Sequence, residues 1–231
     1  MLDELAHAGP EHLDDAFIVG YDRKQGYPDP AEDLAAFEEQ GLGPSSRVVD
    51  LGAGTGQFAI AAARRFGHVT AVDVSPAMLA ALRAKGSAEG LANLDFVNAG
   101  FLSYSREEPA DGCYTRNALH QVPDFWKALA LQRIADMLRP GGVLRLRDLI
   151  YDFQPGQARD IFDDWFANAA TDPAAGYTAA DYAEHIRTEF STFRWLLEPM
   201  LAAAGFDIVS VSFQGRLYGA YTCVKSAVSR S

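Results

Sequence analysis

Short runs of branched apolar residues alternate along the chain with longer stretches that are rich in alanine and leucine. The short runs have the length and the β-branched composition of buried strands, and the longer ones carry apolar residues at helical spacing. The pattern predicts five strands in the first two thirds of the chain, at Arg47–Leu51, His68–Asp73, Leu94–Asn98, Gly112–Arg116 and Val143–Leu149. It predicts helices at Glu32–Gln40, Gly56–Phe66, Pro76–Glu89 and Asp124–Leu138, the last ended by Pro140-Gly141-Gly142. Such alternation indicates an α/β fold, with a mainly parallel, doubly wound sheet between two layers of helices.

The pattern changes after residue 150. Residues 151–191 are rich in aromatic and acidic side chains and predict two helices, at Gly156–Ala170 and Thr178–Phe190. Regular alternation returns with a helix at Thr192–Ala204 and two strands, Phe206–Gln214 and Tyr218–Val224, whose short connection requires antiparallel pairing. We therefore expect an N-terminal helical arm or cap at 1–44 and a core at 45–231, with a helical lid inserted at 151–191.

The composition is that of a globular protein with a hydrophobic core, since 48% of the 231 residues are hydrophobic and 22% are charged. The net charge of −11 disfavours nucleic acid as a partner, because binding to phosphates relies on lysine and arginine. No apolar run reaches the roughly 20 residues of a membrane helix, and the polar N-terminus is unlike a secretory signal. We expect a cytoplasmic protein that acts on a small molecule, without a membrane or nucleic acid partner and with a homodimer as one arrangement.

The two cysteines, Cys113 and Cys223, fall in predicted strands. They are too few for a disulfide scaffold, and no group of histidine, cysteine and acidic residues has the sequence spacing of metal ligands. The sequence therefore predicts no metal site.

The segment most informative about function joins the first predicted strand to the helix that follows it. Gly52, Gly54 and Gly56 occupy alternate positions there, so the backbone can turn tightly and approach a ligand at a helix N-terminus. Gln57 stands where the dinucleotide-binding fingerprint has its third glycine, and the Gly-Lys-Ser/Thr ending of an ATP-binding loop is absent. Asp73, at the end of the second strand, can accept hydrogen bonds from ribose hydroxyls. The pattern predicts a ligand that contains a ribose but no pyrophosphate.

Val48–Gly56 and Ala71–Leu79 resemble the first two motifs of the class I S-adenosylmethionine-dependent methyltransferase family. Two later segments, Arg116–Asp124 and Leu138–Leu144, are similar to the family's fourth-strand segment and to the turn before its fifth strand. The resemblance covers roughly residues 45–150 and, through Ala204–Phe206, the final helix and hairpin. It implies S-adenosylmethionine as cofactor and a seven-stranded sheet of order 3-2-1-4-5-7-6 with strand 7 antiparallel.

The resemblance also implies a set of cofactor contacts at matching positions. Gly52, Ala53 and Gly54 would line the methionine moiety of the cofactor. Asp50 would support the loop and bind the amino group. Residues that would hold the rest of the cofactor are Asp73 on the ribose, Val74 and Met78 on the adenine, and Asn117 beside the sulfonium.

Two further regions are expected to contact the cofactor. Many relatives carry an acidic residue for the adenine amine where this chain has Gly100, next to Phe101. A backbone carbonyl or a neighbour such as Asn98 would take its place, or the adenine pocket differs. In relatives an N-terminal helix closes over the cofactor, and here Tyr21 or Arg23 could pair with the cofactor's carboxylate.

Methyl transfer needs little from the protein beyond orientation of the reactants, plus a base when the acceptor atom carries a proton. His120 is the candidate base, since it follows the fourth strand at the reactive end of the cofactor and an imidazole titrates near neutral pH. The alternative is that His120 only anchors the following helix or packs on the cofactor. His185, on a predicted lid helix, is a second candidate for the substrate pocket. The lid aromatics could hold a flat substrate or could pack on one another.

These observations favour a methyltransferase of secondary metabolism that acts at O, N or C of a small aromatic or heteroaromatic metabolite. The alternative is a protein of this fold that binds S-adenosylmethionine without methylating, in a cyclisation, regulatory or partner-binding role. A nucleic acid or protein methyltransferase is disfavoured by the charge and by the lack of a substrate-peptide motif. A dehydrogenase is disfavoured by Gln57.

Overall fold

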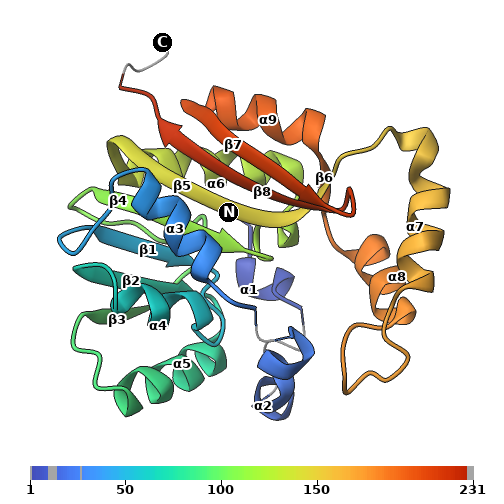
Figure 1. Ribbon diagram of the computed structural model, residues 1–231, viewed down its shortest axis with the longest axis horizontal. Helices are drawn as coiled ribbons and strands as arrows, with labels where there is room; N and C mark the ends of the chain where they lie inside the picture. Colours follow the sequence, from blue (N-terminus) through green and yellow to red (C-terminus); the bar gives the residue numbers. More distant parts are fainter. Residues whose placement is uncertain (1, 10–14, 27, 228–231) are drawn as a thin grey trace.

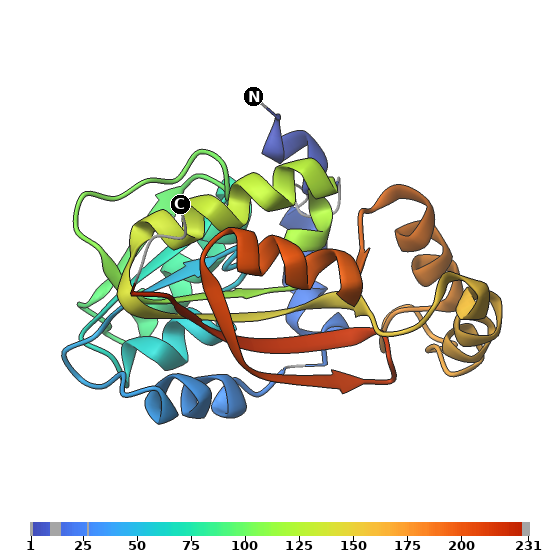
Figure 2. The same cartoon turned by 90° about the horizontal axis from the view of Figure 1, so that it is seen from above.

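The computed structural model describes residues 2–9, 15–26 and 28–227, which form one mixed sheet with helices on both faces (Figures 1 and 2). In this part of the chain the strands run in the order β3-β2-β1-β4-β5-β8-β7, and β6 pairs with β5 beside that path. β8 is antiparallel to both of its neighbours, β5 and β7. The sequence predicts seven strands, and the two-residue β6 is not among them. The sixth and seventh predicted strands therefore correspond to β7 and β8. The predicted fold class, strand order and antiparallel strand are therefore confirmed.

The strands are β1 (Arg47–Leu51), β2 (His68–Asp73), β3 (Leu94–Asn98), β4 (Ala110–Arg116), β5 (Leu138–Tyr151), β6 (Thr192–Phe193), β7 (Phe206–Gln214) and β8 (Tyr218–Lys225). The helices are α1 (Glu4–His7), α2 (Asp15–Lys24), α3 (Ala31–Glu39), α4 (Gln57–Ala63), α5 (Pro76–Ala88), α6 (Asp124–Met137), α7 (Ala158–Ala167), α8 (Ala179–Thr188) and α9 (Arg194–Ala203). Two short 3-10 turns, η2 (Leu119–Gln121) and η3 (Pro155–Gln157), complete the set. Among the described residues, no helix is both long and apolar enough to cross a lipid bilayer.

Strands β1 and β2 are buried along nearly their whole length, as expected of parallel strands with helices on both faces of the sheet. One apolar cluster packs α3, α4 and α5 on the sheet through side chains such as Leu34, Phe58 and Leu82. The other packs α6 and α9 on the opposite face through Leu131 and Leu201. Figure 2 shows α3 and α4 on one side of the sheet and α6 and α9 on the other. This layering leaves the carboxyl ends of the parallel strands accessible to a ligand.

Strand β5 differs from its prediction. It begins at Leu138, directly after α6, and the predicted helix stop at Pro140-Gly141-Gly142 lies inside the strand. The register with β4 shifts there, because Leu138 pairs with Ala110 but Val143 pairs with Gly112. The extra residues form an irregular stretch in which Gly141 has a φ of +73°. The helix does end just before the proline, at Met137, but the proline and glycines also form a bulge in β5, whose predicted start at Val143 was wrong.

The residues predicted as a lid lie beyond the carboxyl end of β5, at one side of the molecule (Figure 1). Thr178 caps α8 through a capping box with Asp181, as the helix prediction requires. The predicted helix at Thr192–Ala204 starts later, at Arg194, because Thr192 and Phe193 pair with the end of β5 instead. The position of residues 151–191 is compatible with a cap over the end of the sheet. The division of the chain into arm, core and lid stays a prediction.

The lid aromatics pack mainly on one another. Tyr151, Phe153 and Trp165 are buried in one apolar cluster at this end of the sheet. The ring of Trp165 stacks on that of Tyr182 with centroids 4.0 Å apart. Tyr182 and Tyr177 also line the large cavity beside the lid. Most of the aromatic side chains in this segment therefore stabilise the lid, and these two also face a space that a ligand can enter.

Candidate cofactor and acceptor site

The loop after β1 depends on its glycines. Gly52, Gly54 and Gly56 have φ values of +73°, +52° and +88°, which L-residues with side chains rarely adopt. A Cβ atom on Gly52 would lie 2.5 Å from the Cβ of Ala118, and one on Gly56 would lie 1.8 Å from the Cδ1 of Leu82. The loop therefore needs glycine both for its turn and for its close approach to η2 and α5.

Asp73, at the end of β2, fastens this loop to the start of α5. Its carboxylate accepts a hydrogen bond from the backbone N–H of Gly54 at 2.8 Å and one from that of Ser75 at 2.8 Å. Ser75 in turn caps α5 by accepting a hydrogen bond from the N–H of Met78. The carboxylate of Asp73 thus lies at the wall of a cavity and is held there by the backbone.

Most of the residues expected to contact the cofactor come together around this cavity. Those that line it are Tyr21, Gly52, Gly54, Asp73, Val74, Met78, Gly100, Phe101 and Asn117. Asp50 and Ala53 line an adjoining pocket on the other side of the loop. Asp50 is buried beneath the loop, and burial followed by the nearby charge of Asp73 raises its pKa well above the usual range. Arg23 is exposed and lines neither of these two pockets.

The N-terminal segment contributes Glu4, Ala8 and Tyr21 to the cavity wall. Tyr21 of α2 approaches the loop, since a Cβ on Gly54 would lie 3.8 Å from its ring. Glu4 of α1 accepts hydrogen bonds from the N–H of Leu102 at 3.0 Å and from the hydroxyl of Ser103 at 3.1 Å. A Cβ on Gly100 would lie 2.5 Å from a Glu4 carboxylate oxygen. A carboxylate therefore does lie beside Gly100, but it comes from the N-terminal arm.

Glu4, Arg116 and Gln121 also line the cavity and carried no assigned role in the sequence. Arg116 could have been singled out because it ends a parallel strand, where ligands bind in folds of this kind. Glu4 gave no such signal, since it lies far from the other cavity residues in the sequence. Asn98, the suggested replacement for the missing acid, instead donates hydrogen bonds to the carbonyls of Asp73 and Val74 at 2.9 Å each.

A second and larger cavity, of about 820 Å³, continues from the first toward the lid. The two cavities share Arg116, Asn117 and Gln121. Asn117 has a φ of +47°, and its N–H donates to the carbonyl of Arg147 at 2.9 Å, which holds the residue at the boundary between the two spaces. A ligand in the first cavity can therefore expose one end to a second molecule in the larger cavity.

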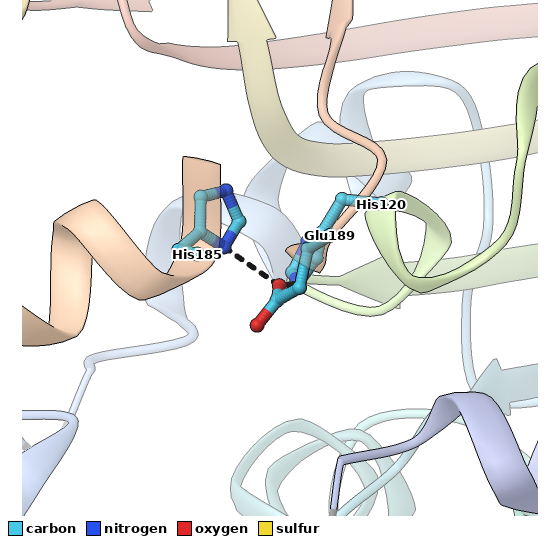
Figure 3. Close-up of side chains that lie close together, drawn as sticks. All are labelled: His120, His185 and Glu189. Atoms are coloured by element: carbon cyan, nitrogen blue, oxygen red, sulfur yellow. Dashed lines mark ion pairs between the residues drawn. The ribbon is translucent and has the colours of Figure 1, made fainter. Parts of the chain in front are cut away.

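His120 of η2 is buried on the wall of the larger cavity between two carboxylates. Figure 3 shows one of them, that of Glu189, beside the ring. Nδ1 of His120 contacts Asp148, and its Nε2 lies 2.8 Å from the Oε2 of Glu189. Burial alone would lower the pKa of His120, but the charges of Asp148 and Glu189 raise it to about 9. The surroundings thus favour the protonated imidazole, whereas a base must be neutral. The base function suggested by the sequence stays a prediction, and the anchoring alternative gains support from the hydrogen bond that the N–H of Phe190 donates to the His120 carbonyl.

His185 of α8 lies on the other side of Glu189. Its Nδ1 is 2.6 Å from the same Oε2 atom, and its Nε2 is 2.7 Å from the hydroxyl of Ser191. Burial would raise the pKa of Glu189, but the two neighbouring imidazoles lower it well below the usual range. Three candidate metal ligands, His120, His185 and Glu189, therefore lie together where the sequence predicts no metal site. The cluster was invisible in the sequence because its members come from two separate segments.

A family model described as a methyltransferase domain matches residues 48–142. The match covers less than half of the chain, so it shows that this part of the chain is similar to a methyltransferase domain. The matched range runs from β1 into β5, and so it contains the glycine loop, Asp73 and Asn117.

Individual relatives are similar to the chain over part of its length. Trans-aconitate 2-methyltransferase of Deinococcus radiodurans is 37% identical over 118 residues, which are 51% of this chain and 43% of the relative. Ubiquinone biosynthesis O-methyltransferase of Xylella fastidiosa is 34% identical over 101 residues, or 43% of this chain and 40% of the relative. The chain thus covers less than half the length of these two relatives.

The fold is shared with solved structures over most of the chain. The [4+2]-cyclase SpnF superimposes with a TM-score of 0.65 and 19% identity, over 87% of this chain and 81% of that one. At this level of identity the likeness shows the fold of the chain and nothing finer.

Proposed function

We propose that the protein transfers a methyl group from S-adenosylmethionine to a small molecule bound in the larger cavity. The observation that carries the proposal is the convergence of the glycine loop, Asp73 and Asn117 on one cavity that opens into a second. The family match supports the choice of S-adenosylmethionine over other nucleosides. When bound, this cofactor supplies a methyl group activated on a sulfonium sulfur.

The residues around the first cavity suit an adenosine. Asp73 would accept hydrogen bonds from the ribose hydroxyls, and Val74 and Met78 offer an apolar surface to the adenine. The carboxylate of Glu4, beside Gly100, would accept from the exocyclic amine that an acidic residue holds in many relatives. The cavity wall has no cluster of basic side chains for a pyrophosphate, since Arg116 is the only Lys or Arg among its described lining residues.

The pocket behind the loop suits the amino-acid end of the cofactor. Gln57 lines it, and its Oε1 atom is buried without a hydrogen-bond partner in the described part of the chain. An unpaired buried amide oxygen is costly, and an ammonium group would satisfy it. Asp50, beneath the same pocket, would support that ammonium, and Tyr21 and Arg116 approach from the open side. Gln57, which disfavours the dinucleotide fingerprint, would thus accept a hydrogen bond from the ammonium group of the cofactor.

The larger cavity would bind the methyl acceptor and hold its reactive atom near Asn117 and Gln121. Tyr177, Tyr182 and Tyr218 on its wall favour an aromatic or heteroaromatic metabolite, as expected of an enzyme of secondary metabolism. The catalytic contribution of the chain would be mainly orientation and exclusion of water, since displacement at a sulfonium needs close, in-line approach. Methylation at O, N or C is compatible with this wall.

Turnover with labelled cofactor tests the proposal. The full chain is incubated with S-adenosylmethionine carrying a labelled methyl group and with a panel of aromatic, heteroaromatic and carboxylate acceptors, and the products are resolved by mass spectrometry. We expect label in one acceptor class together with an equal amount of S-adenosylhomocysteine. Cofactor binding without S-adenosylhomocysteine for any acceptor would instead favour the alternative of a binding protein that does not methylate.

A further inference from the structure

His120, His185 and Glu189, here called the His–Glu–His cluster, lie where the lid meets the core (Figure 3). His120 belongs to η2, His185 to α8, and Glu189 follows α8 directly. One potential ligand atom from each residue lies within 4.8 Å of the other two. Both imidazoles approach the same oxygen, Oε2 of Glu189, at 2.8 Å and 2.6 Å. The cluster forms part of the wall of the larger cavity, so an ion bound there would be accessible to a ligand.

The ring nitrogens that point away from Glu189 have partners of their own. Nδ1 of His120 contacts the buried carboxylate of Asp148, and Nε2 of His185 is within 2.7 Å of the Ser191 hydroxyl. Histidines that bind metals nearly always donate their second N–H to such a group, which fixes the tautomer and orients the ring. This outer layer leaves Nε2 of His120 and Nδ1 of His185 as the two nitrogens directed at Glu189.

The two imidazoles stabilise the oxygen that lies between them. Oε2 of Glu189 is buried and pairs with one ring nitrogen on each side, although neither N–H meets it with good hydrogen-bond geometry. These ion pairs require protons on both inward-facing nitrogens, and a cation between the three side chains would take the place of those protons. Two imidazoles with one carboxylate suit a divalent transition metal better than calcium or magnesium.

We propose that His120, His185 and Glu189 bind a divalent transition-metal ion, with Zn²⁺ as the reference ion, and leave one coordination position open toward the larger cavity. Three protein ligands with an open position are the arrangement of zinc sites that bind substrate, whereas structural sites have four. Binding of the ion follows from the cluster alone. Its use rests on the proposed function: the ion would hold an oxygen or nitrogen atom of the acceptor and orient it toward the first cavity.

The competing explanation is an ion-pair cluster that fastens the lid to the core without any metal. Glu189 would then bridge two protonated imidazoles, and the hydrogen bond from the Phe190 N–H to the His120 carbonyl would complete the junction. Both explanations predict that substitutions in the cluster lower stability. Only the metal site predicts a spectrum and an affinity that depend on an added ion.

The test uses the full chain stripped with a chelator and then titrated with Zn²⁺ by calorimetry and with Co²⁺ by visible absorption. We expect one ion per chain and the intense visible bands of a four-coordinate Co²⁺ site that Zn²⁺ abolishes. His185→Ala and Glu189→Gln should each weaken Zn²⁺ affinity at least about tenfold. The matched control is His68→Ala, since His68 pairs with Asp95 at the surface and should contribute nothing. The circular dichroism spectrum of each variant is compared with that of the wild type, and only variants that fold are included in the affinity comparison.

The outcomes separate this proposal from the proposed function. Equal Zn²⁺ affinities for the wild type, the cluster variants and the His68 control, or no Co²⁺ bands, would overturn the metal site. Calorimetry with S-adenosylhomocysteine on the same samples reports on the cofactor cavity, which lies across Asn117 and Gln121 from the cluster. Zn²⁺ binding without methyl transfer would support the site and contradict only the proposed function.

Discussion

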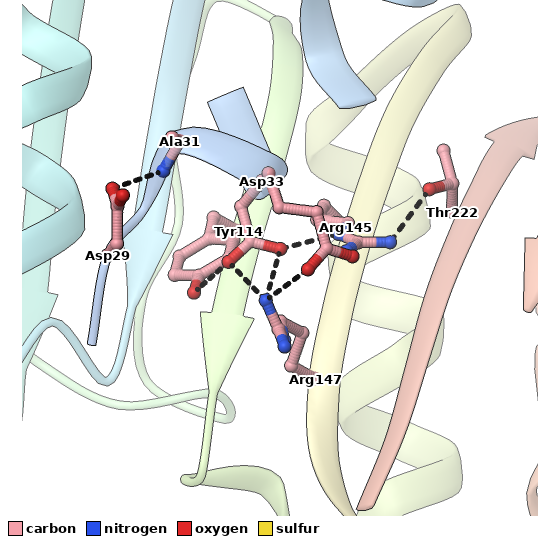
Figure 4. A network of polar contacts seen from close by, with 8 residues as sticks. Asp29, Ala31, Asp33, Tyr114, Arg145, Arg147 and Thr222 are labelled. Carbon is pink, nitrogen blue, oxygen red and sulfur yellow. Dashed lines mark hydrogen bonds and ion pairs between the residues drawn. The ribbon is translucent and has the colours of Figure 1, made fainter. Parts of the chain in front are cut away.

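Replacing Asp33 by alanine is expected to lower the free energy of unfolding by about 3–5 kcal/mol, the range observed when one partner of a buried ion pair is removed. Asp33 of α3 is fully buried. Its carboxylate accepts from Nε of Arg145 at 2.7 Å, from Arg147 at 3.2 Å and from the hydroxyl of Tyr114 at 2.9 Å (Figure 4). Without it, the buried guanidinium of Arg145 loses its closest counter-charge, and α3 loses its buried polar contacts with β4 and β5. Urea unfolding followed by circular dichroism measures the change.

Glu32 provides the matched control. It precedes Asp33 on the same helix and contacts the same two arginines, at 2.9 Å and 3.4 Å, but its side chain is 63% exposed. Exposed ion pairs contribute about 0–1 kcal/mol, so Glu32→Ala should change stability by no more than that. Equal effects of the two substitutions would show that burial of Asp33 is not what makes its contacts important.

Replacing Asp73 by alanine is expected to weaken the binding of S-adenosylmethionine about 10–100-fold. A hydrogen bond to a charged group contributes about 1.5–3 kcal/mol, and each 1.4 kcal/mol corresponds to a factor of ten in affinity. The substitution removes the proposed contact with the ribose and also frees the N–H of Gly54, which the carboxylate holds at 2.8 Å. Isothermal titration calorimetry of the variant and the wild type under the same conditions measures the difference.

Asp95→Ala is the control for a lost carboxylate in the same region. Asp95 lies on β3, beside β2, and its largely exposed side chain pairs with His68 outside both cavities. It should leave the cofactor affinity unchanged. If Asp73→Ala folds like the wild type and binds S-adenosylmethionine equally well, Asp73 is not part of the cofactor site.

The sheet could be predicted because its signals are local. The predicted bounds of β1, β2, β3 and β7 agree with the structure residue by residue, since each is a short run of strand-forming residues ended by glycine, proline or polar residues. The start of β5 could not be predicted, because it depends on Leu138 pairing with Ala110 on another strand. The two residues of β6 likewise become a strand only through contact with the end of β5.

The same distinction applies to the site. The glycine loop and Asp73 lie within one strand–helix–strand unit, so their spacing alone brings them together. Glu4 reaches Gly100 from the N-terminal arm, 96 residues earlier in the sequence, and no local pattern connects the two. The His–Glu–His cluster and the pairing of Asp33 with Arg145 are also products of tertiary folding. Sequence spacing predicted the proposed nucleoside-binding half of the site, whereas the proposed acceptor half required the structure.

A crystal structure of the full chain with S-adenosylhomocysteine tests the cofactor site most directly. We expect the ribose hydroxyls on the Asp73 carboxylate, the adenine between Met78 and the segment at Gly100, and the sulfur beside Asn117, facing the larger cavity. A nucleoside bound elsewhere, or a crevice that stays empty at saturating ligand, would contradict the site.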